Sequence, residues 1–150
     1  MQRKDIIFIA IGVLIDQVTK YIAQFNLTFF KGVEIIPNAL TFQLVHNYGA
    51  AYGILQNQRL FLLLVSAAVI VFCFLFSKKI ATTTAAKYGL LFLLIGTIGN
   101  FIDRLLLGYV IDFIDIRIFP VFNIADVSID IGIGCFILDI FLQKNDEKNA

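Results

Sequence analysis

The stretch VIDFIDIRIFPVFNIAD, residues 110–126, lies between two strongly apolar segments of the chain. It holds three carboxylates, Asp112, Asp115 and Asp126, together with an arginine, an asparagine and a proline. Acidic residues at the edge of membrane-spanning segments are costly and usually have a function. We therefore predict that Asp112 and Asp126 form a pair that transfers protons on a substrate bound at the membrane surface.

The composition is that of an integral membrane protein. Of the 150 residues, 59% are hydrophobic and only 15% are charged, whereas soluble chains average about 25% charged residues. The chain has 16 phenylalanines, and its apolar surface exceeds what a core of this size can bury, so part of it should face lipid. The net charge of +1 gives no reason to expect nucleic acid as a partner.

Four apolar segments predict a mainly α-helical membrane protein with four transmembrane helices. A helix of about 20 residues covers the roughly 30 Å thickness of the bilayer core. We expect one integral membrane domain that occupies residues 1–150. Its spans are predicted at about 6–25, 60–77, 88–107 and 123–142.

Residues 26–58 are the longest region without an apolar span. The segments VEII and ALTFQLV within it are rich in β-branched and aromatic residues and are separated by turn-forming residues. This pattern predicts short strands with turns. The region is too apolar for a free linker, so it should pack on the membrane surface or over the helices. Residues 108–122 are expected to form a short loop.

The basic residues predict the orientation in the membrane. Four spans put both termini and the 78–87 loop on one side. The positive charges of these segments are Arg3, Lys4, Lys78, Lys79, Lys87, Lys144 and Lys148. By the positive-inside tendency that side is cytoplasmic, and the 26–58 and 108–122 regions are outside. Polar residues of three spans then converge near the outer face, which indicates a functional site there.

Asp112 and Asp126 suit the hydrolysis of a peptide bond. Hydrolysis without a covalent intermediate needs a base that activates water and an acid that protonates the leaving nitrogen. Two carboxylates that share one proton supply both, because two close negative charges cannot both form easily. The alternative is that Asp112 caps a surface helix and Asp126 caps the fourth span, since aspartate suits helix N-termini. Spacing alone leaves both interpretations open.

The segment GTIGNFIDR, residues 96–104, carries a second polar group. Asn100, Asp103 and Arg104 lie on one helical face because they are spaced three and four residues apart. The two glycines allow close approach of another helix. We favour a binding site here over the alternatives, a buried Asp103–Arg104 contact or an arginine that extends to the membrane interface.

Two other polar segments are less specific. Asp16 and Lys20 in DQVTK are one turn apart and should form a pair that fixes the first helix. Lys20 alternatively reaches lipid phosphates. The segment NYGAAYG, residues 47–53, is either a turn or a loop on which an extended peptide lies.

Two further acids lie in the fourth predicted span. Asp130 is one turn from Asp126 on the same face and is expected to pair with Lys20 or Arg104, or to be protonated. Asp139 lies about 20 Å further along the helix. That distance puts Asp139 near the inner surface, where we expect a solvated side chain.

Other chemistries have little support. The single histidine, His46, excludes zinc sites that need several histidines. Cys73 and Cys135 lie in apolar runs and are interpreted as small hydrophobic residues. A Ser128–Lys20 dyad is conceivable at the outer level but ranks below the aspartate pair.

Five motifs occur along nearly the whole chain. They are IDQVTK (15–20), NYGAAYGIL (47–55), GTIGNFIDR (96–104), VIDF (110–113) and FNIADVSI (122–129). In this order and at these spacings they resemble signal peptidase II, the bacterial lipoprotein signal peptidase. The five together are highly specific, although any one alone is weak.

The resemblance implies a four-helix enzyme of the bacterial cell membrane. Both termini would be cytoplasmic, and a small extracytoplasmic β-cradle would be built largely from residues 26–58. The activity would be that of an aspartyl endopeptidase without metal or other cofactor, and we expect a monomer among membrane lipids. Its substrates would be prolipoproteins whose lipobox cysteine carries diacylglyceryl, cleaved on the amino side of that cysteine. The cyclic peptide globomycin should inhibit it.

The family's catalytic aspartates match Asp112 and Asp126. Its substrate-binding or dyad-supporting positions match Asp16, Lys20, Asn47, Gly49, Asn100, Asp103, Arg104 and Asn123. Asp115 and Arg117 match no motif position and are expected to be loop residues. Departures from the family pattern are small, and Asp130 stands where a neutral residue is usual.

Two non-peptidase functions remain as alternatives. A proton-coupled transporter would use Asp16, Asp126 and Asp130, but transporters favour sites at the membrane midplane and internal repeats, which the sequence lacks. A non-catalytic assembly factor would bind another membrane protein through the polar face and would tolerate loss of either aspartate of the pair.

Overall fold

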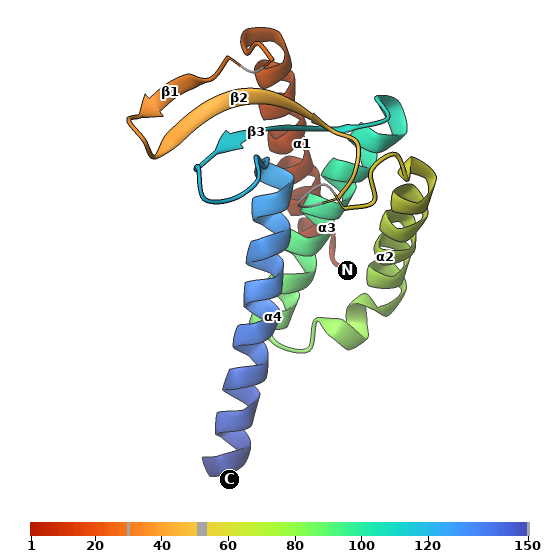
Figure 1. Ribbon diagram of the computed structural model, residues 1–150. Coiled ribbons are helices and arrows are strands. Elements are labelled where there is room, and N and C mark those ends of the chain that lie inside the picture. Colours follow the sequence, from red (N-terminus) through yellow and green to blue (C-terminus); the bar gives the residue numbers. More distant parts are fainter. Residues whose placement is uncertain (30, 51–53, 150) are drawn as a thin grey trace.

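Four long helices and a three-stranded sheet make up the computed structural model (Figure 1). It describes residues 1–29, 31–50 and 54–149, the last five without their side chains. The helices are α1 (Arg3–Asn26), α2 (Arg59–Ile80), α3 (Thr84–Leu106) and α4 (Ile124–Asn149). The strands are β1 (Val33–Ile36), β2 (Leu40–Asn47) and β3 (Val110–Asp115). The protein is thus mainly helical.

Helix α3 lies at the centre and packs against the other three helices. Its residues Leu90, Leu94 and Ile95 are buried, and they form the core with Ile9 of α1 and Cys73 of α2. The outer faces of the helices expose large apolar side chains, for example Leu14, Phe25 and Leu75. Surfaces of this kind need lipid around them.

Glycines bring α3 and α4 into close contact. A Cβ atom at Gly96 would collide with the carbonyl oxygen of Ala125, and one at Gly132 would lie 2.8 Å from the backbone nitrogen of Leu93. Small residues allow such close packing of helices in membranes. The first residues of α4 are therefore fixed against α3, and this matters for the site described below.

Three helices of the described part of the chain, α1, α2 and α3, are long and apolar enough to cross a membrane. Helix α4 is of similar length, but the segment from Asp126 to Asp139 holds three aspartates. The helices extend past the predicted apolar segments at several ends. Helix caps allow polar residues to extend these helices, because they provide partners for the free backbone N–H groups of the first turn. The hydroxyl of Thr83, for example, accepts the N–H of Ala86 at 3.0 Å.

The sheet has the order β1-β2-β3 with antiparallel neighbours. Strands β1 and β2 lie in the 26–58 region, as the pattern of β-branched residues predicted. The expectation of a loop at 108–122 was wrong in part, because β3 lies within it. In β3 the apolar residues Val110, Ile111 and Phe113 are buried, although two aspartates interrupt their pattern in the sequence. Val110 and Ile111 pair with β2.

Asp115 differs from the expectation of a loop residue, whereas Arg117 confirms it, because Arg117 lies in the bend after β3. Asp115 is the last residue of β3 and is buried, and its carboxylate accepts the amide N–H of Gln43 at 2.8 Å. Arg117 donates to the hydroxyl of Thr41 at 2.8 Å. Both residues therefore hold β2 and β3 together at one end of the sheet.

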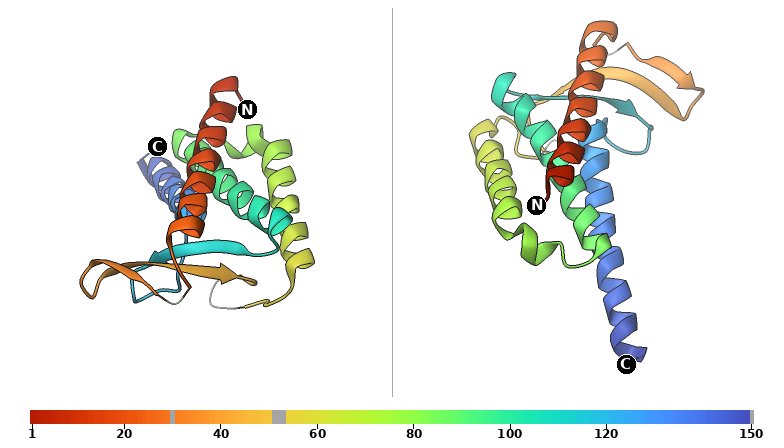
Figure 2. Two further views of the ribbon diagram at one scale, coloured as in Figure 1. Left: turned by 90° about the horizontal axis from the view of Figure 1, so that it is seen from above. Right: turned by 180° about the vertical axis from the view of Figure 1, so that it is seen from behind.

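The sheet lies at one end of the helices, and the C-terminal end of α4 extends away at the other (Figures 1 and 2). At the end far from the sheet, Lys87 pairs with Asp5 at 2.7 Å. Asp139 lies there too, but the expectation of a solvated side chain was wrong. It is buried, because Thr83 and Gln143 both donate hydrogen bonds to its carboxylate.

Candidate active site

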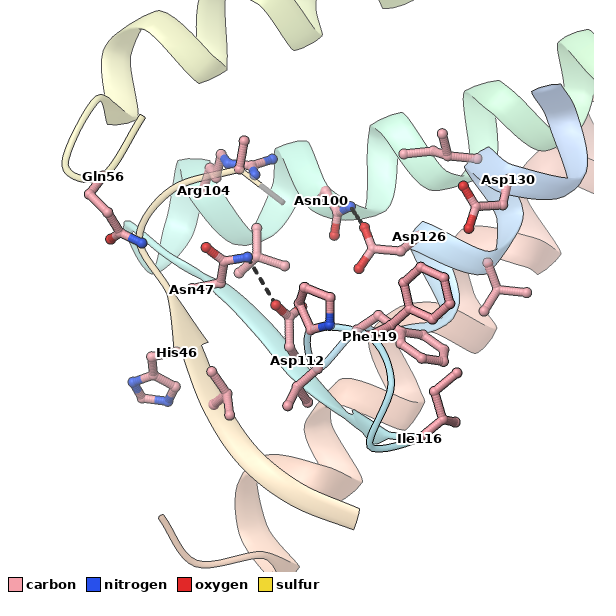
Figure 3. Close-up of a pocket in the computed structure, with 18 of the residues that line it drawn as sticks. His46, Asn47, Gln56, Asn100, Arg104, Asp112, Ile116, Phe119, Asp126 and Asp130 are labelled. Carbon is pink, nitrogen blue, oxygen red and sulfur yellow. Dashed lines mark hydrogen bonds between the residues drawn. The ribbon is translucent and has the colours of Figure 1, made fainter. Parts of the chain in front are cut away.

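Asp112 is held in the middle of β3 by two asparagine amides. The Nδ2 of Asn123 donates to its Oδ1 at 2.7 Å. The Nδ2 of Asn47 donates to its Oδ2 at 3.0 Å (Figure 3). The register of the sheet places Asn47, at the end of β2, beside this part of β3. Asp112 is only 2% exposed. It belongs to a strand, so it does not cap a helix.

Asp126 lies in the first turn of α4. Its Oδ1 accepts the amide N–H of Asn100 at 2.8 Å, and its Oδ2 accepts the backbone N–H of Asn123 at 3.2 Å. In return, the Oδ1 of Asn123 accepts the backbone N–H of Asp126 at 3.0 Å. Asp126 thus helps to cap the N-terminus of α4, which was the alternative to a catalytic role. Its Oδ1 still accepts a hydrogen bond from Asn100 of α3.

Asn123 connects these two acids and is fully buried. Its side-chain nitrogen lies near the Oδ1 of Asn100 at 3.2 Å and the backbone oxygen of Ile111 at 3.3 Å, as well as near Asp112. The amide of one residue therefore sets the relative position of α3, β3 and α4. Both acids are fixed on elements that this amide holds in place.

A cavity of about 840 Å³ contains both acids. Figure 3 shows Asp112 and Asp126 pointing into it from β3 and α4. Arg104, Asn47 and Gln56 line one end, and apolar side chains that include Phe119 and Ile116 line the other. A cavity with an apolar wall and a few convergent polar groups is the usual form of a substrate site.

Burial, together with the nearby charge of Asp126, raises the pKa of the Asp112 carboxyl from 3.8 to about 7. The hydrogen bonds from Asn47 and Asn123 and the positive charge of Lys20 oppose this rise. The net result is a carboxyl group that holds a proton close to neutral pH. Such a group is suited to act as a general acid.

A second group of charges lies behind the first and is almost completely buried. The ammonium of Lys20 is 2.9 Å from Asp16 and 3.0 Å from Asp103, and it donates to the Oδ1 of Asn100 at 3.0 Å. Asp16 also accepts the backbone N–H of Ala125 at 2.8 Å. Asp103 accepts that of Ile111 at 3.1 Å. These bonds connect α1 and α3 to β3 and α4.

This arrangement confirms the predicted Asp16–Lys20 pair. The proposal that Lys20 reaches lipid phosphates was wrong, because Lys20 is 1% exposed and fully paired inside the protein. The Asp103–Arg104 contact was also not found, since Asp103 binds Lys20. The side chains of Asp103 and Arg104 thus serve different parts of the site.

Arg104 fixes the loop that follows β2. It donates to the backbone oxygen of Gly49 at 3.0 Å, and the backbone N–H of Gly49 donates to the Oδ1 of Asn47 at 2.9 Å. The amide oxygen of Asn47 is thereby occupied, so its nitrogen points to Asp112. Residues 51–53 of the predicted NYGAAYG loop lie outside the described residues.

Comparison with known proteins identifies the family. The family profile described as signal peptidase (SPase) II matches residues 8–142. The chain belongs to the signal peptidase II family. A lipoprotein signal peptidase of Shouchella clausii is 39% identical over 92% of this chain and 93% of its own length. One of Brevibacillus brevis is 36% identical over 93% of this chain and 95% of its own length.

Two solved structures, each described as a bacterial membrane enzyme determined by the in meso method, are also similar. The one at 2.3 Å resolution has a TM-score of 0.90 and 34% identity, over 98% of this chain and 93% of its own. The one at 1.9 Å resolution has a TM-score of 0.82 and 36% identity, over 91% of this chain and 92% of its own. Fold and family therefore agree, and the chain is an integral membrane protein. The family favours a peptidase over a transporter or an assembly factor.

Sequence reasoning missed one residue that supports this signal peptidase II site. The amide nitrogen of Gln17 donates to Asp103 at 3.0 Å and to the backbone oxygen of Gly99 at 3.2 Å. Gln17 is three residues before Lys20, so helical spacing places both on one face of α1. That spacing is the signal that could have identified it.

Two other interpretations concern this site. Asp130 is exposed and does not pair with Lys20 or Arg104, whose partners are described above. The alternative, that Asp130 is protonated, stays a prediction. The hydroxyl of Ser128 donates to the backbone oxygen of Ile124 at 2.9 Å, so the lower-ranked dyad with Lys20 is not formed. Asp130 nevertheless lines the cavity.

Within the described residues, no group of three or more histidine, cysteine, aspartate or glutamate side chains is arranged to hold a metal ion. The side chains that line the cavity near the acids are amides, a guanidinium and apolar groups. The chemistry that these residues themselves supply is proton transfer and hydrogen bonding.

Proposed function

We propose that Asp112 and Asp126 are the catalytic pair with which this signal peptidase II removes signal peptides from prolipoproteins. The family supports an aspartyl endopeptidase that acts on the amino side of the lipid-modified cysteine. The observation that carries the proposal is the cavity itself. Two carboxylates face it, and among the described residues the hydrogen bonds that hold them come only from neutral amide groups.

We assign the base to Asp126 and the acid to Asp112. Asp126 lies at the N-terminus of α4, where the helix dipole and the backbone N–H of Asn123 stabilise negative charge. Asp112 lies on a strand, is nearly inaccessible to solvent, and gains no helix dipole. The shared proton therefore rests on Asp112, and Asp126 is ionised.

The reaction follows from these two states. Asp126 takes a proton from water as the water oxygen attacks the carbonyl carbon of the scissile bond, while Asp112 donates a hydrogen bond to the carbonyl oxygen. The tetrahedral intermediate collapses when the C–N bond breaks, and a proton from the pair passes to the leaving nitrogen of the lipid-modified cysteine. The products are the signal peptide carboxylate and a free amine.

The remaining motif residues have two proposed roles. Asn47, Asn100 and Asn123 hold the two acids, and Arg104 with Gly49 positions the loop and the substrate backbone. Asp16, Lys20 and Asp103 fix the helices behind the pair. The support for this division is burial, since the last three are at most 2% exposed whereas Asn47, Asn100 and Arg104 line the cavity.

We also propose a membrane arrangement. All four helices span the bilayer, with spans at about 6–25, 60–77, 88–107 and 123–142. The close packing of α4 along α3 through glycines supports a span for α4 as well. Both termini are cytoplasmic and the sheet is an extracytoplasmic cradle, as the basic residues favour. The diacylglyceryl chains lie among lipids of the outer leaflet. The enzyme acts as a monomer and is inhibited by globomycin.

Conservative substitution tests the pair. Asp112→Asn and Asp126→Asn keep size and polarity but remove the carboxyl group that takes up and gives up a proton, so each should lower cleavage of a diacylglyceryl-modified precursor by about 10³-fold or more. Asp115→Asn is the matched control, since Asp115 lies on the same strand, binds Gln43 and does not line the cavity. It should retain activity. Near-normal cleavage by either folded dyad variant would refute the proposal.

A further inference from the structure

Asp130 lies in the wall of the catalytic cavity, one helical turn beyond Asp126 on α4 (Figure 3). Four residues of helix place it about 6 Å further along the axis. That direction leads away from the sheet (Figure 1). Asp130 is exposed, and none of the hydrogen bonds and ion pairs of the described residues involves its side chain.

The two ends of the cavity differ in hydrogen-bonding character. At one end, Arg104, Gln56 and Asn47 carry N–H donors. At the other end the wall is apolar, with Phe119 and Ile131 among its residues, and Asp130 provides a carboxyl group. The oxygens of a carboxyl group accept hydrogen bonds. A bound ligand therefore meets donors at one end and an acceptor at the other.

An extended peptide has the complementary groups. Its backbone must be extended across the pair for a water molecule to reach the scissile carbonyl, so its peptide N–H groups lose the bonds they make in a helix. In an apolar surrounding each unsatisfied N–H costs several kcal/mol. A carboxylate on the cavity wall removes that cost for one of them.

The direction of the peptide follows from the membrane arrangement, and so this inference rests on the proposed function. The signal segment reaches the site from within the bilayer. The end of the cavity at Asp130, which lies further along α4, therefore receives the residues that precede the scissile bond. The lipid-modified cysteine and the chain after it lie toward Arg104 and Asn47.

We propose that Asp130 is a substrate-binding residue that accepts a hydrogen bond from a peptide N–H of the signal segment, just before the cleaved bond. It makes this contact in both the bound state and the transition state. Loss of the contact should then raise KM and leave kcat nearly unchanged.

The test uses the full-length enzyme in mixed micelles and a synthetic lipopeptide substrate. Asp130→Leu removes the acceptor and suits an exposed helical position, whereas Asp130→Asn keeps an acceptor oxygen. We expect Asp130→Leu to raise KM about tenfold with kcat within about twofold, and Asp130→Asn to raise KM no more than about threefold. Thermal unfolding of both variants confirms that they are folded.

A second set of substrates identifies the donor. In each, one peptide bond among those before the lipid-modified cysteine is replaced by an ester, which has no N–H. One ester substrate should raise KM for the wild-type enzyme and leave KM of Asp130→Leu unchanged, because the contact is already absent there. Equal effects of every ester on both enzymes would overturn the inference.

Asp126→Asn separates this inference from the proposed function. If Asp126→Asn is inactive and Asp130→Leu has the KM of the wild type, then Asp130 does not bind the substrate and the catalytic pair stands. If folded Asp126→Asn cleaves at a near-normal rate, both proposals fail. A fall in kcat for Asp130→Asn with a shifted pH profile would instead show that Asp130 acts on the pair, which also overturns the inference.

Discussion

Two groups of acidic side chains lie next to each other in this protein and differ in their partners, which are a lysine in one group and asparagines in the other. The lysine cluster consists of Asp16, Lys20 and Asp103, in which one ammonium lies within 3.0 Å of both carboxylates. The amide cluster consists of Asp112, Asp126 and the three asparagines that donate to them or link them, Asn47, Asn100 and Asn123. Asn100 touches both, since its oxygen accepts from Lys20 and its nitrogen donates to Asp126.

This difference shows how aspartate has a structural role in one cluster and a reactive role in the other. In the lysine cluster the cation pairs with both acids, and their hydrogen bonds hold four elements of the fold together. Neutral amides orient the acids of the other cluster without neutralising them. Two negative charges then compete in a cavity, so one acid keeps a proton.

Adding a cation to the amide cluster should give the largest effect. Asn47→Lys replaces the amide that donates to Asp112 with an ammonium, which should ionise Asp112 at neutral pH and remove the general acid. We expect cleavage to fall about 10³-fold. Asn47→Ala, which removes only one hydrogen bond, should cost about tenfold. An Asn47→Lys enzyme as active as Asn47→Ala would contradict the comparison.

Removing the cation of the lysine cluster should instead destabilise the fold. Lys20→Met leaves two buried carboxylates without a partner, and a loss of about 3–5 kcal/mol in the free energy of unfolding is expected. Unfolding in mixed micelles by increasing anionic detergent measures it. Lys144→Met is the control, because Lys144 is exposed near the end of α4 and should leave stability unchanged. Equal stability of the two variants would show that Lys20 is dispensable.

The close approach of α1 and α3 at the lysine cluster gives a third test. A Cβ atom at Gly99 would lie 2.5 Å from the Oδ2 of Asp16 and 3.1 Å from the Cβ of Ala125. Gly99→Ala should therefore lower stability by about 2–3 kcal/mol. Gly134→Ala is matched to it, since no atom of the described residues outside its own helix backbone lies within 4 Å of that Cβ position on α4. That variant should be neutral or up to about 1 kcal/mol more stable.

The smallest expected effect is the loss of folding stability when Asp112 becomes ionised. Its pKa is about 7 in the folded protein and 3.8 in the unfolded chain. The folded state therefore binds the proton more tightly, and stability falls as pH rises from about 4 to about 7. Asp112→Asn lacks this dependence, so its gain in thermal midpoint over the wild type should grow across that range. We expect Asp112→Asn to gain about 2 kcal/mol in the free energy of unfolding at pH 8. The gain is limited because the amide accepts fewer hydrogen bonds than the carboxylate. A gain that does not depend on pH would refute this prediction.

Much of the fold could be predicted because it depends on local pattern. The apolar segments predicted the four helices, and β-branched runs predicted β1 and β2. The i,i+4 spacing predicted the pair between Asp16 and Lys20. Strand β3 escaped prediction, because Asp112 and Asp115 interrupt its apolar residues and its pairing with β2 joins distant parts of the chain.

Contacts between distant residues account for the other errors. The sequence does not show that Thr83 from another helix binds Asp139 and allows its burial. It also does not show that Lys20 binds Asp103 and Asn100. Lys20 is therefore not available to pair with Asp130. The roles of Asp112 and Asp126 stay predictions from motif and cavity until their variants are assayed.

The most direct test of the account is an infrared titration of the Asp112 carboxyl group in the wild-type enzyme. The band of the protonated acid is assigned by its absence in Asp112→Asn. We predict that Asp112 loses its proton with a pKa of about 7, and at a lower pH in Asp126→Asn, where the neighbouring charge is gone. A midpoint near the ordinary value of 3.8, or one that Asp126→Asn leaves unchanged, would contradict a proton shared by the pair.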